Sequence, residues 1–340
     1  MTVSLRPQID QIESHPEIPL TTEQMRAAMD LLLSGTADED EVATFLLALK
    51  NRGETAVEIS VAAQAMRDHS TRFQGPPGAI DTCGTGGDGA KTWNISTAVA
   101  FVLAGCDVPV AKHGNKAVSS ASGSSDILSE LGVNLHADMP VIQSALDEIG
   151  IAFLFAQRHH PAMRHVAPIR AKMGVRTIFN VLGPLTNPAG AAFQLLGVYN
   201  QSLCRVLAQT LHTLGATGAW VVHGSDGLDE LTLTGPSHVA ALVNGKITEF
   251  DVSPADFGLA ECAAEALTGG DVRTNATAFR ALLCGEQNAY RDIVLLNAAA
   301  GLLIVGQESD KKSAVARAAK AIDSGAARAK LEALITKTNS

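Results

Sequence analysis

Residues 79–97 read AIDTCGTGGDGAKTWNIST, and this stretch decides the fold class. A short apolar run at 79–82 precedes a glycine-rich loop, and an apolar segment of helical length follows from Thr92. A strand, a tight loop and a helix in this order are typical of the first half of a βαβ unit. The stretch therefore predicts an α/β domain whose sheet is largely parallel.

The same alternation continues along the chain. Further strands are predicted at 108–111, 151–155, 195–199 and 219–223, and helices at 92–104, 125–131, 141–149 and 202–214. Residues 239–252 favour a hairpin, because Asn244-Gly245 suits a type I′ turn. From about residue 255 the chain is rich in alanine and favours helices. We expect a mostly parallel central sheet followed by a helical C-terminal part.

The first seventy residues predict a small all-helical domain, because each expected helix opens with a capping box. The pairs are Thr21 with Gln24, Thr36 with Glu39 and Thr55 with Glu58. Gly-Pro-Pro-Gly at 75–78 breaks any helix and marks a linker. We therefore predict a helical domain at 1–74, a hinge at 75–80 and the α/β domain at 81–340.

Composition and charge narrow the class of protein. The 340 residues are 46% hydrophobic, 18% charged and 4% aromatic, with a net charge of −9, which indicates a globular protein without a general nucleic-acid-binding surface. The interval between Glu148 and Asp226 nevertheless contains no acidic residue and carries six basic ones. The basic residues are Arg158, Arg164, Arg170, Lys172, Arg176 and Arg205. This imbalance favours an anionic small molecule bound in a cleft.

Cysteine usage and hydropathy indicate a cytoplasmic location. The five cysteines are widely spaced and form no CxxC motif, so neither a disulfide framework nor a zinc site is expected. The most apolar stretch, 95–111, is interrupted by Ser96, Thr97 and Asp107, and the N-terminus lacks the pattern of a signal peptide. No membrane association is expected.

The loop at 84–89, Gly-Thr-Gly-Gly-Asp-Gly, leaves three interpretations open. Its amides could cradle phosphate at a helix N-terminus, it could be the fingerprint of a dinucleotide-binding fold, or it could be a simple turn. The dinucleotide interpretation requires an acid at the end of the next strand, where Lys112-His113 stands instead. A Walker A loop is also incomplete, because Ala90 separates Gly89 from Lys91.

Two further segments carry candidate chemistry. Residues 112–125 are rich in hydroxyls, glycines and cations, and two such loops at adjacent strand ends would border one crevice. Asp229-Glu230 follows the strand at 219–223 and could hold magnesium, although acidic pairs in this position also serve as solvated turns. The three histidines His159, His160 and His165 lack metal-site spacing and suggest a structural role. Asn275-Ala276-Thr277 matches a glycosylation motif, which carries no weight without a secretory signal.

Several long motifs in one order resemble the anthranilate phosphoribosyltransferase family. They are the stretches 81–89, 94–97, 112–115 with 118–120, 159–163, 176–180 with 183–188, and 229–230. The resemblance covers almost the whole chain. It implies a helical N-terminal domain, a hinge, a large α/β domain of the nucleoside phosphorylase and phosphoribosyltransferase type, and a homodimer formed through the helical domains.

The resemblance also implies a set of binding residues. For phosphoribosyl pyrophosphate they are Gly84, Gly87, Asp88, Thr92, Asn94, Ile95, Ser96, Thr97, Lys112, His113, Gly114, Asn115, Lys116, Ala117, Val118, Ser119, Ser120 and Ser124. For anthranilate they are Gly84, Asn115 and Arg170, and for Mg²⁺ they are Ser96, Asp229 and Glu230. Lys116 stands where many members of the family have arginine, so a bidentate phosphate contact is not expected there.

The implied reaction displaces pyrophosphate from ribose C1 by the amine of anthranilate. Charge moves onto the pyrophosphate as the bond breaks, which magnesium, Lys112 and the loop amides would stabilise. No general base stands out in the sequence. Two alternatives remain: a pyrimidine nucleoside phosphorylase, which is expected to carry Lys-His-Ser-Thr-Gly-Gly where this chain has Lys112-His113-Gly114-Asn115, and a nucleic-acid-binding relative, which should be more basic. No motif in the sequence indicates whether an amidotransferase subunit associates.

Overall fold

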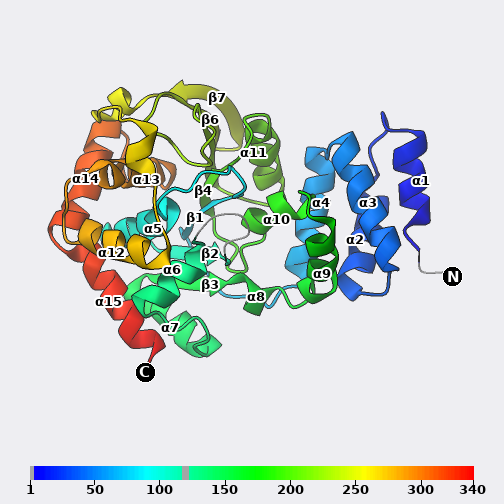
Figure 1. The fold of residues 1–340 in the computed structure, drawn as a ribbon, viewed down its shortest axis with the longest axis horizontal. Helices are drawn as coiled ribbons and strands as arrows, with labels where there is room; N and C mark the ends of the chain where they lie inside the picture. Colours follow the sequence, from blue (N-terminus) through cyan, green and yellow to red (C-terminus); the bar gives the residue numbers. More distant parts are fainter. Residues whose placement is uncertain (1–3, 117–121) are drawn as a thin grey trace.

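The computed structural model describes residues 4–116 and 122–340, which form a helical part beside a larger α/β part (Figure 1). The helical part begins with α1 (Arg6–Ser14), α2 (Thr22–Ser34), α3 (Glu39–Arg52) and α4 (Ala56–Asp68). Two helices from the middle of the chain, α9 (Met163–Met173) and α10 (Phe179–Leu185), pack against them. The boundaries between the domains stay a prediction, since α9 and α10 lie late in the sequence.

The α/β part is built on one seven-stranded sheet with the order β3-β2-β1-β4-β5-β6-β7. Its strands are β1 (Ile80–Gly84), β2 (Val110–Gly114), β3 (Ile151–Phe155), β4 (Phe193–Gly197), β5 (Gly218–Gly224), β6 (Ser237–Val243) and β7 (Lys246–Val252). The first five are parallel, and β6 and β7 are antiparallel. The strand order reverses direction at β1, between β2 and β4. Parallel sheets bind ligands at such a switch point, beyond the carboxyl ends of the strands.

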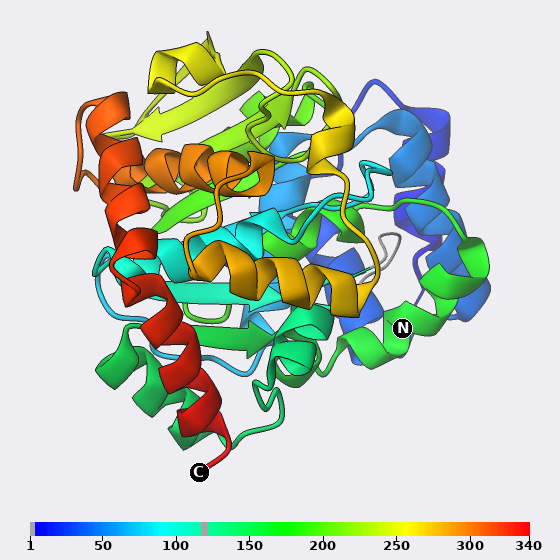
Figure 2. The ribbon, with the colours of Figure 1, turned by 60° about the vertical axis from the view of Figure 1, so that its left-hand side comes forward.

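Helices cover both faces of the sheet. One core contains α5 (Ile95–Gly105), whose residues are almost all buried because it lies between the sheet and α13 (Ala289–Ile304). The C-terminal helices α12 (Val272–Leu283), α13, α14 (Lys311–Asp323) and α15 (Ala326–Thr338) belong to the same side (Figure 2). On the other face, α11 (Leu203–Thr213) packs on β5 and β6, and it also contacts α4 of the helical part.

The remaining helices connect the strands. They are α6 (Ser124–Leu131), α7 (Met139–Ile149) and α8 (Ala156–His159), with two short 3-10 helices at Pro254–Phe257 and Ala264–Leu267. Among the described residues, no helix is both long and apolar enough to cross a membrane.

The predicted fold class is confirmed, with element ends displaced by a few residues. β3 has the predicted bounds, and the hairpin turns at Asn244 and Gly245 with φ of 50° and 74°, as a type I′ turn requires. The boxes at Thr21 and Thr55 are present. The box predicted at Thr36 is wrong, because α3 begins at Glu39 and is capped by Asp38, whose carboxylate accepts from the amides of Asp40 and Glu41. An acidic cap has the further advantage of the positive helix terminus.

Candidate active site

The candidate site lies at the switch point, where β1, β2 and β5 each end in a loop that carries predicted residues. The glycine-rich loop follows β1, the loop beginning at Asn115 follows β2, and Asp229-Glu230 follows β5. Strand pairing places β1 between β2 and β4, with β5 next to β4. The predicted binding segments, which are far apart in sequence, therefore reach one edge of the sheet.

Asp229 packs directly on two strand ends. Its Oδ2 accepts a hydrogen bond of 2.7 Å from the amide of Gly86. A Cβ atom at Gly84 would overlap this carboxylate, and one at Gly197 would overlap the Asp229 carbonyl. Both strand ends thus require glycine because the acidic residue approaches so closely.

The carboxyl groups of Asp229 and Glu230 both have raised pKa values. Burial and the nearby Asp88 raise the pKa of Asp229 to about 7. Burial, with Asp229 as the next cause, raises the pKa of Glu230 well above its ordinary value, although Lys112 and the amide of Ser96 act in the opposite direction. Two neighbouring carboxyl groups with raised pKa values are an environment that a bound cation would stabilise.

The donor set fits a magnesium ion whose remaining ligands come from substrate. The two carboxylates, Asp88 and the Ser96 hydroxyl offer only oxygen atoms, which Mg²⁺ prefers. Within 4–116 and 122–340, no group of three or more His, Cys, Asp or Glu side chains is arranged to hold a metal alone. Mg²⁺ commonly binds through one or two carboxylates together with substrate phosphates, so the two observations agree.

The buried side chains of Lys112 and Asp81 form hydrogen bonds between β1 and β2. The Lys112 side chain is 2% exposed, and its ammonium donates to the carbonyl of Thr82 and, at 3.3 Å, to Ser96 Oγ. Burial lowers its pKa, which Asp81 partly offsets. Asp81 accepts from the amide of His113 at 3.1 Å and from Asn187 Nδ2 at 2.8 Å, and burial raises its pKa to about 6. The described contacts of Lys112 are therefore to protein oxygens.

Three histidines near the end of β2 are buried. His113 and His160 lie with ring centroids 5.1 Å apart, and His159 Nδ1 is 3.0 Å from the carbonyl of Thr71, which follows α4. Burial lowers the pKa of all three, that of His160 to about 4 and that of His113 well below its ordinary value. The contacts of His159 and His160 support the structural role predicted from their spacing.

Two arginines, Arg170 in α9 and Arg176 just after it, differ in their contacts. Arg170 Nη2 donates to Asn180 Oδ1 at 3.3 Å, and its guanidinium lies 5.3 Å from the centre of the Phe179 ring. Arg170 Nε is buried without a hydrogen-bond partner, and burial lowers the pKa of the side chain. Arg176 donates to the carbonyl of Gly87 and stacks 4.0 Å from the centre of the Tyr199 ring. Arg176, which was not among the predicted binding residues, thus holds the glycine-rich loop.

Three of the six cations of the basic interval have partners in distant segments of the protein. Lys172 pairs with Glu39 at 2.9 Å, and Arg205 pairs with Glu249 on β7. Arg158 donates to a backbone carbonyl at Ala137. The anionic ligand expected from this interval stays a prediction, and acidic residues from distant segments pair with two of its six cations.

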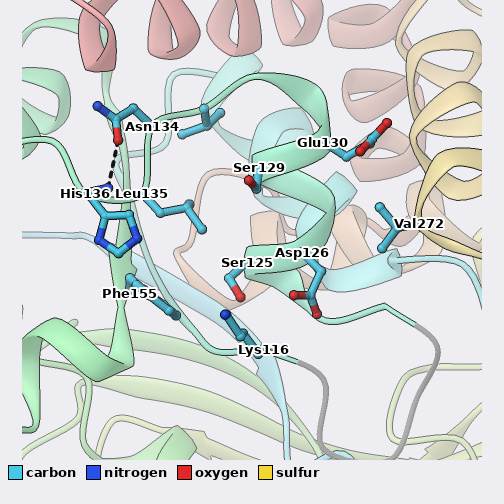
Figure 3. A pocket seen from close by; sticks show the side chains of 11 residues that line it. Lys116, Ser125, Asp126, Ser129, Glu130, Asn134, Leu135, His136, Phe155 and Val272 are labelled. Atoms are coloured by element: carbon cyan, nitrogen blue, oxygen red, sulfur yellow. Dashed lines mark hydrogen bonds between the residues drawn. The ribbon is translucent and has the colours of Figure 1, made fainter.

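The loop after β2 is described only at its two ends. The predicted residues Ala117, Val118, Ser119 and Ser120 lie outside the described residues. The Asn115 carbonyl accepts from the Ser125 amide at 3.3 Å, so the two ends of the loop meet where α6 begins. Figure 3 shows a cavity of about 480 Å³ beside α6, lined by Lys116, Asp126, His136 and neighbouring side chains. Of the predicted binding residues, its lining includes Lys116.

Gly114 ends β2 and Ser124 begins α6, and the remaining predicted residues are in or beside α5. Thr92 forms an isolated antiparallel bridge with Thr268, and Ile95 and Thr97 are buried in the core. Asn94 precedes α5 and donates to the carbonyl of Ser122 at 3.0 Å. Asn94 also accepts from Asn275, a residue to which the sequence assigned no structural or functional role. No local pattern indicates this contact, because the partners are 181 residues apart.

The fold and site define the class of protein. Residues 10–70 match the helical bundle domain of the glycosyl transferase family, and residues 76–328 match its a/b domain. The chain is therefore a glycosyltransferase built from these two domains.

Individual relatives give the particular family. The chain is 55% identical over 317 residues to the anthranilate phosphoribosyltransferase of Rhodospirillum rubrum, covering 93% of this chain and 91% of the relative. It is 54% identical to that of Azospirillum brasilense, covering 92% and 88%. The chain belongs to the anthranilate phosphoribosyltransferase family.

Solved structures agree with this assignment. The enzyme from Thermus thermophilus superposes with a TM-score of 0.91 at 41% identity, covering 97% of this chain and 100% of that one. The enzyme from Saccharomyces cerevisiae, in complex with PRPP and Mg, gives a TM-score of 0.91 at 28% identity, with 98% of each chain covered.

Proposed function

We propose that this chain transfers the 5-phosphoribosyl group of phosphoribosyl pyrophosphate to the amine of anthranilate, a step of tryptophan biosynthesis. The products are N-(5-phosphoribosyl)anthranilate and pyrophosphate. The observation that carries the proposal is the pair of half-buried Asp229 and buried Glu230 against the glycine-rich loop at the switch point. The five cysteines are free thiols, and we place the reaction in the cytoplasm.

The bond from ribose C1 to the pyrophosphate oxygen breaks, and a bond from C1 to the anthranilate nitrogen forms. The nitrogen then loses one proton, and the pyrophosphate leaves with the bonding electron pair. An aniline nitrogen can attack in its neutral form, so no general base is assigned. Catalysis then depends on positioning and on stabilising the charge of the leaving group.

The binding residues are proposed as the family resemblance assigns them. The amides of the glycine-rich loop and the hydroxyls of Ser96 and Thr97 would hold phosphoribosyl pyrophosphate, with Asn94 at the start of α5. Asp229, Glu230 and Ser96 would hold Mg²⁺, which supplies positive charge to the departing pyrophosphate. Arg170 would bind the carboxylate of anthranilate.

We also propose a homodimer formed through the helical part. The exposed fractions of Ile18, Leu47 and Val57 there are 49%, 39% and 58%. Apolar side chains of this size contribute little to stability while exposed, and burying them against a second copy would be favourable.

Loss of anthranilate fluorescence tests the reaction directly. The protein is mixed with phosphoribosyl pyrophosphate, Mg²⁺ and anthranilate, and the signal should fall only when all three are present. EDTA should stop the reaction, and excess Mg²⁺ should restore it. A protein that binds both substrates yet leaves the fluorescence unchanged would contradict the proposal.

A further inference from the structure

A segment of the C-terminal helical part reaches back to the residues between the glycine-rich loop and α5. The amide of Gly269 donates to the carbonyl of Lys91 at 2.7 Å, and Thr268 pairs with Thr92 as an isolated antiparallel bridge. A Cβ atom at Gly269 would lie 2.8 Å from the Thr92 carbonyl oxygen, so this approach requires glycine. The segment then enters α12, which lies on the same side of the sheet as α13 and α15 (Figure 2).

Asn275, in the first turns of α12, links this segment to α5. Its side chain is buried at 2% exposure. Its Oδ1 accepts from the amide of Gly270 at 2.7 Å, and its Nδ2 donates to Asn94 Oδ1 at 3.0 Å. Asn94 Nδ2 in turn donates to the carbonyl of Ser122 at 3.0 Å.

The direction of this hydrogen-bonded chain is fixed at both ends. An amide N–H at Gly270 can only donate, and the carbonyl at Ser122 can only accept. The two carboxamides between them must therefore both point the same way, with each oxygen toward Gly270 and each NH₂ toward Ser122. A carboxamide NH₂ has two N–H donors, so Asn94 could donate to a ligand as well as to Ser122.

This series of hydrogen bonds connects the two segments that border the proposed substrate. Asn94 lies between the glycine-rich loop and α5, and Ser122 is close to the start of α6. Tyr290 Oη also donates to the Asn94 carbonyl at 3.4 Å, and the Tyr290 ring stacks on Trp93 at 5.3 Å. The backbone of Asn94 is thus held by α13, while the orientation of its side chain depends on Asn275.

We propose that Asn275 is a positioning residue for phosphoribosyl pyrophosphate. It orients the Asn94 carboxamide so that the NH₂ group faces both the Ser122 carbonyl and the substrate. This inference rests on the proposed function. Asn275 itself touches protein atoms in the hydrogen bonds described, and it acts through Asn94.

Asn275→Asp is the sharpest test, because it keeps the acceptor for Gly270 and removes the donor to Asn94. A carboxylate facing Asn94 Oδ1 forces the carboxamide to rotate, and its oxygen then faces the Ser122 carbonyl. The KM for phosphoribosyl pyrophosphate should rise about 2- to 12-fold, the factor expected for one lost hydrogen bond. The KM for anthranilate should change less than about twofold, since none of the residues proposed to bind anthranilate takes part in these hydrogen bonds.

Three controls separate positioning from general destabilisation. Asp310→Ala removes the cap of α14, a hydrogen bond of 2.8 Å to the Ser313 amide, and should lower Tm without raising either KM. In an Asn94→Ala background, Asn275→Asp should add less than about twofold to the KM for phosphoribosyl pyrophosphate. Asn275→Ser keeps a short polar side chain that cannot reach Asn94, and it gives the same expected result if the aspartate variant does not fold.

The outcomes distinguish this inference from the proposed function. If wild type consumes anthranilate and Asn275→Asp leaves the KM for phosphoribosyl pyrophosphate unchanged, the positioning role is wrong. Additive effects of the two substitutions, or equal rises in both KM values that follow Tm, would also overturn it. If wild type itself shows no transfer, the proposed function fails, and calorimetric titration of phosphoribosyl pyrophosphate into wild type and Asn275→Asp still decides the positioning role.

Discussion

Arg170 holds its charge in a setting that favours a bound anion. Its Nε is buried without a partner, and its Nη2 contact to Asn180 is long at 3.3 Å. A carboxylate that accepts from the guanidinium would supply the missing partner and would orient the neighbouring amine. The side chain therefore combines an unsatisfied donor with the family position for anthranilate.

Arg170→Ala should lower kcat/KM toward anthranilate about 10- to 150-fold, the cost of a charge-assisted hydrogen bond of about 1.5–3 kcal/mol. Affinity for phosphoribosyl pyrophosphate should change much less. Arg170→Lys should recover part of the affinity and little of the turnover, because it lacks the planar fork. Lys172→Ala, on the same helix but paired with Glu39, is the matched control. Equal losses toward both substrates would defeat the assignment.

Asp229→Asn and Glu230→Gln should each lower turnover strongly at limiting Mg²⁺ and leave the fold intact. The Asp229→Asn variant would still offer a carbonyl oxygen to the Gly86 amide, from which Asp229 Oδ2 accepts at 2.7 Å in the wild type. Neither amide supplies the charge that a divalent ion requires. Steady-state rates measured against Mg²⁺ concentration check this, and wild-type activity in both variants would show that the metal is held elsewhere.

The same two carboxyl groups predict how Mg²⁺ should stabilise the protein at different pH values. The pKa of Asp229 is raised from 3.8 to about 7 in the folded chain, so between these values the folded state binds the proton more tightly than the unfolded state. The contribution of Asp229 to stability without metal should therefore fall as pH rises through this window and level off above pH 7. Metal binding requires the deprotonated form, so the rise in Tm caused by Mg²⁺ should be larger at pH 8 than at pH 6.

Calorimetry at pH 5, 6, 7 and 8, with EDTA or with Mg²⁺, measures this difference. The double variant Asp229→Asn with Glu230→Gln should show no increase of the Mg²⁺ effect with pH. A wild-type Mg²⁺ effect that is constant across the range would contradict the assigned ligands.

At the scale of the helices and strands, short sequence motifs predicted the features that depend on residues close together in the sequence. The hairpin turn depends on two residues that accept positive φ, and the boxes at Thr21 and Thr55 depend on partners three residues apart. The start of α3 was missed because Asp38 competes with Thr36, and an acidic side chain accepting two amides is the better cap. The roles of Asn187 and Asn275 were not predictable, since their partners are distant in sequence.

One predicted capping box does more than begin a helix. Glu58 is fully buried and accepts from Thr55, from the amide of Leu20 at 2.9 Å and from Arg52 Nη2 at 2.6 Å. This carboxylate therefore joins the start of α4 to the segment before α2 and to the end of α3. The contacts to Leu20 and Arg52 arise only when the three helices pack.

Glu58→Ala should lower the free energy of unfolding by about 3–5 kcal/mol, because it leaves the buried Arg52 without its partner. Thr21→Ala removes an exposed capping bond and should cost only about 1 kcal/mol. Urea unfolding of the two variants compares these values directly. Similar losses in both would show that Glu58 acts as a cap alone.

At the scale of the whole molecule, the sheet brings together loops whose order no local pattern specifies. The strand pattern predicted a parallel sheet, but the position of β1 between β2 and β4 follows from how the crossover helices pack on the two faces. That position places the glycine-rich loop beside Asp229. The site residues were thus available from motifs, and their proximity was available only from the fold.

The helical part extends away from the sheet, with α1 at its outer end (Figure 1). A helix of 9 residues is marginal on its own, and the apolar side chains Leu47 and Val57 remain exposed. A second copy would bury them, and a stable interface removes about 800 Å² from each partner. We therefore expect a dimer by light scattering at micromolar concentration.

Leu47→Glu combined with Val57→Glu should give a monomer, because two like charges would be forced into the interface. Val243→Glu, at an equally exposed position beside the hairpin turn, should remain dimeric. A fully active wild-type monomer would exclude the interface.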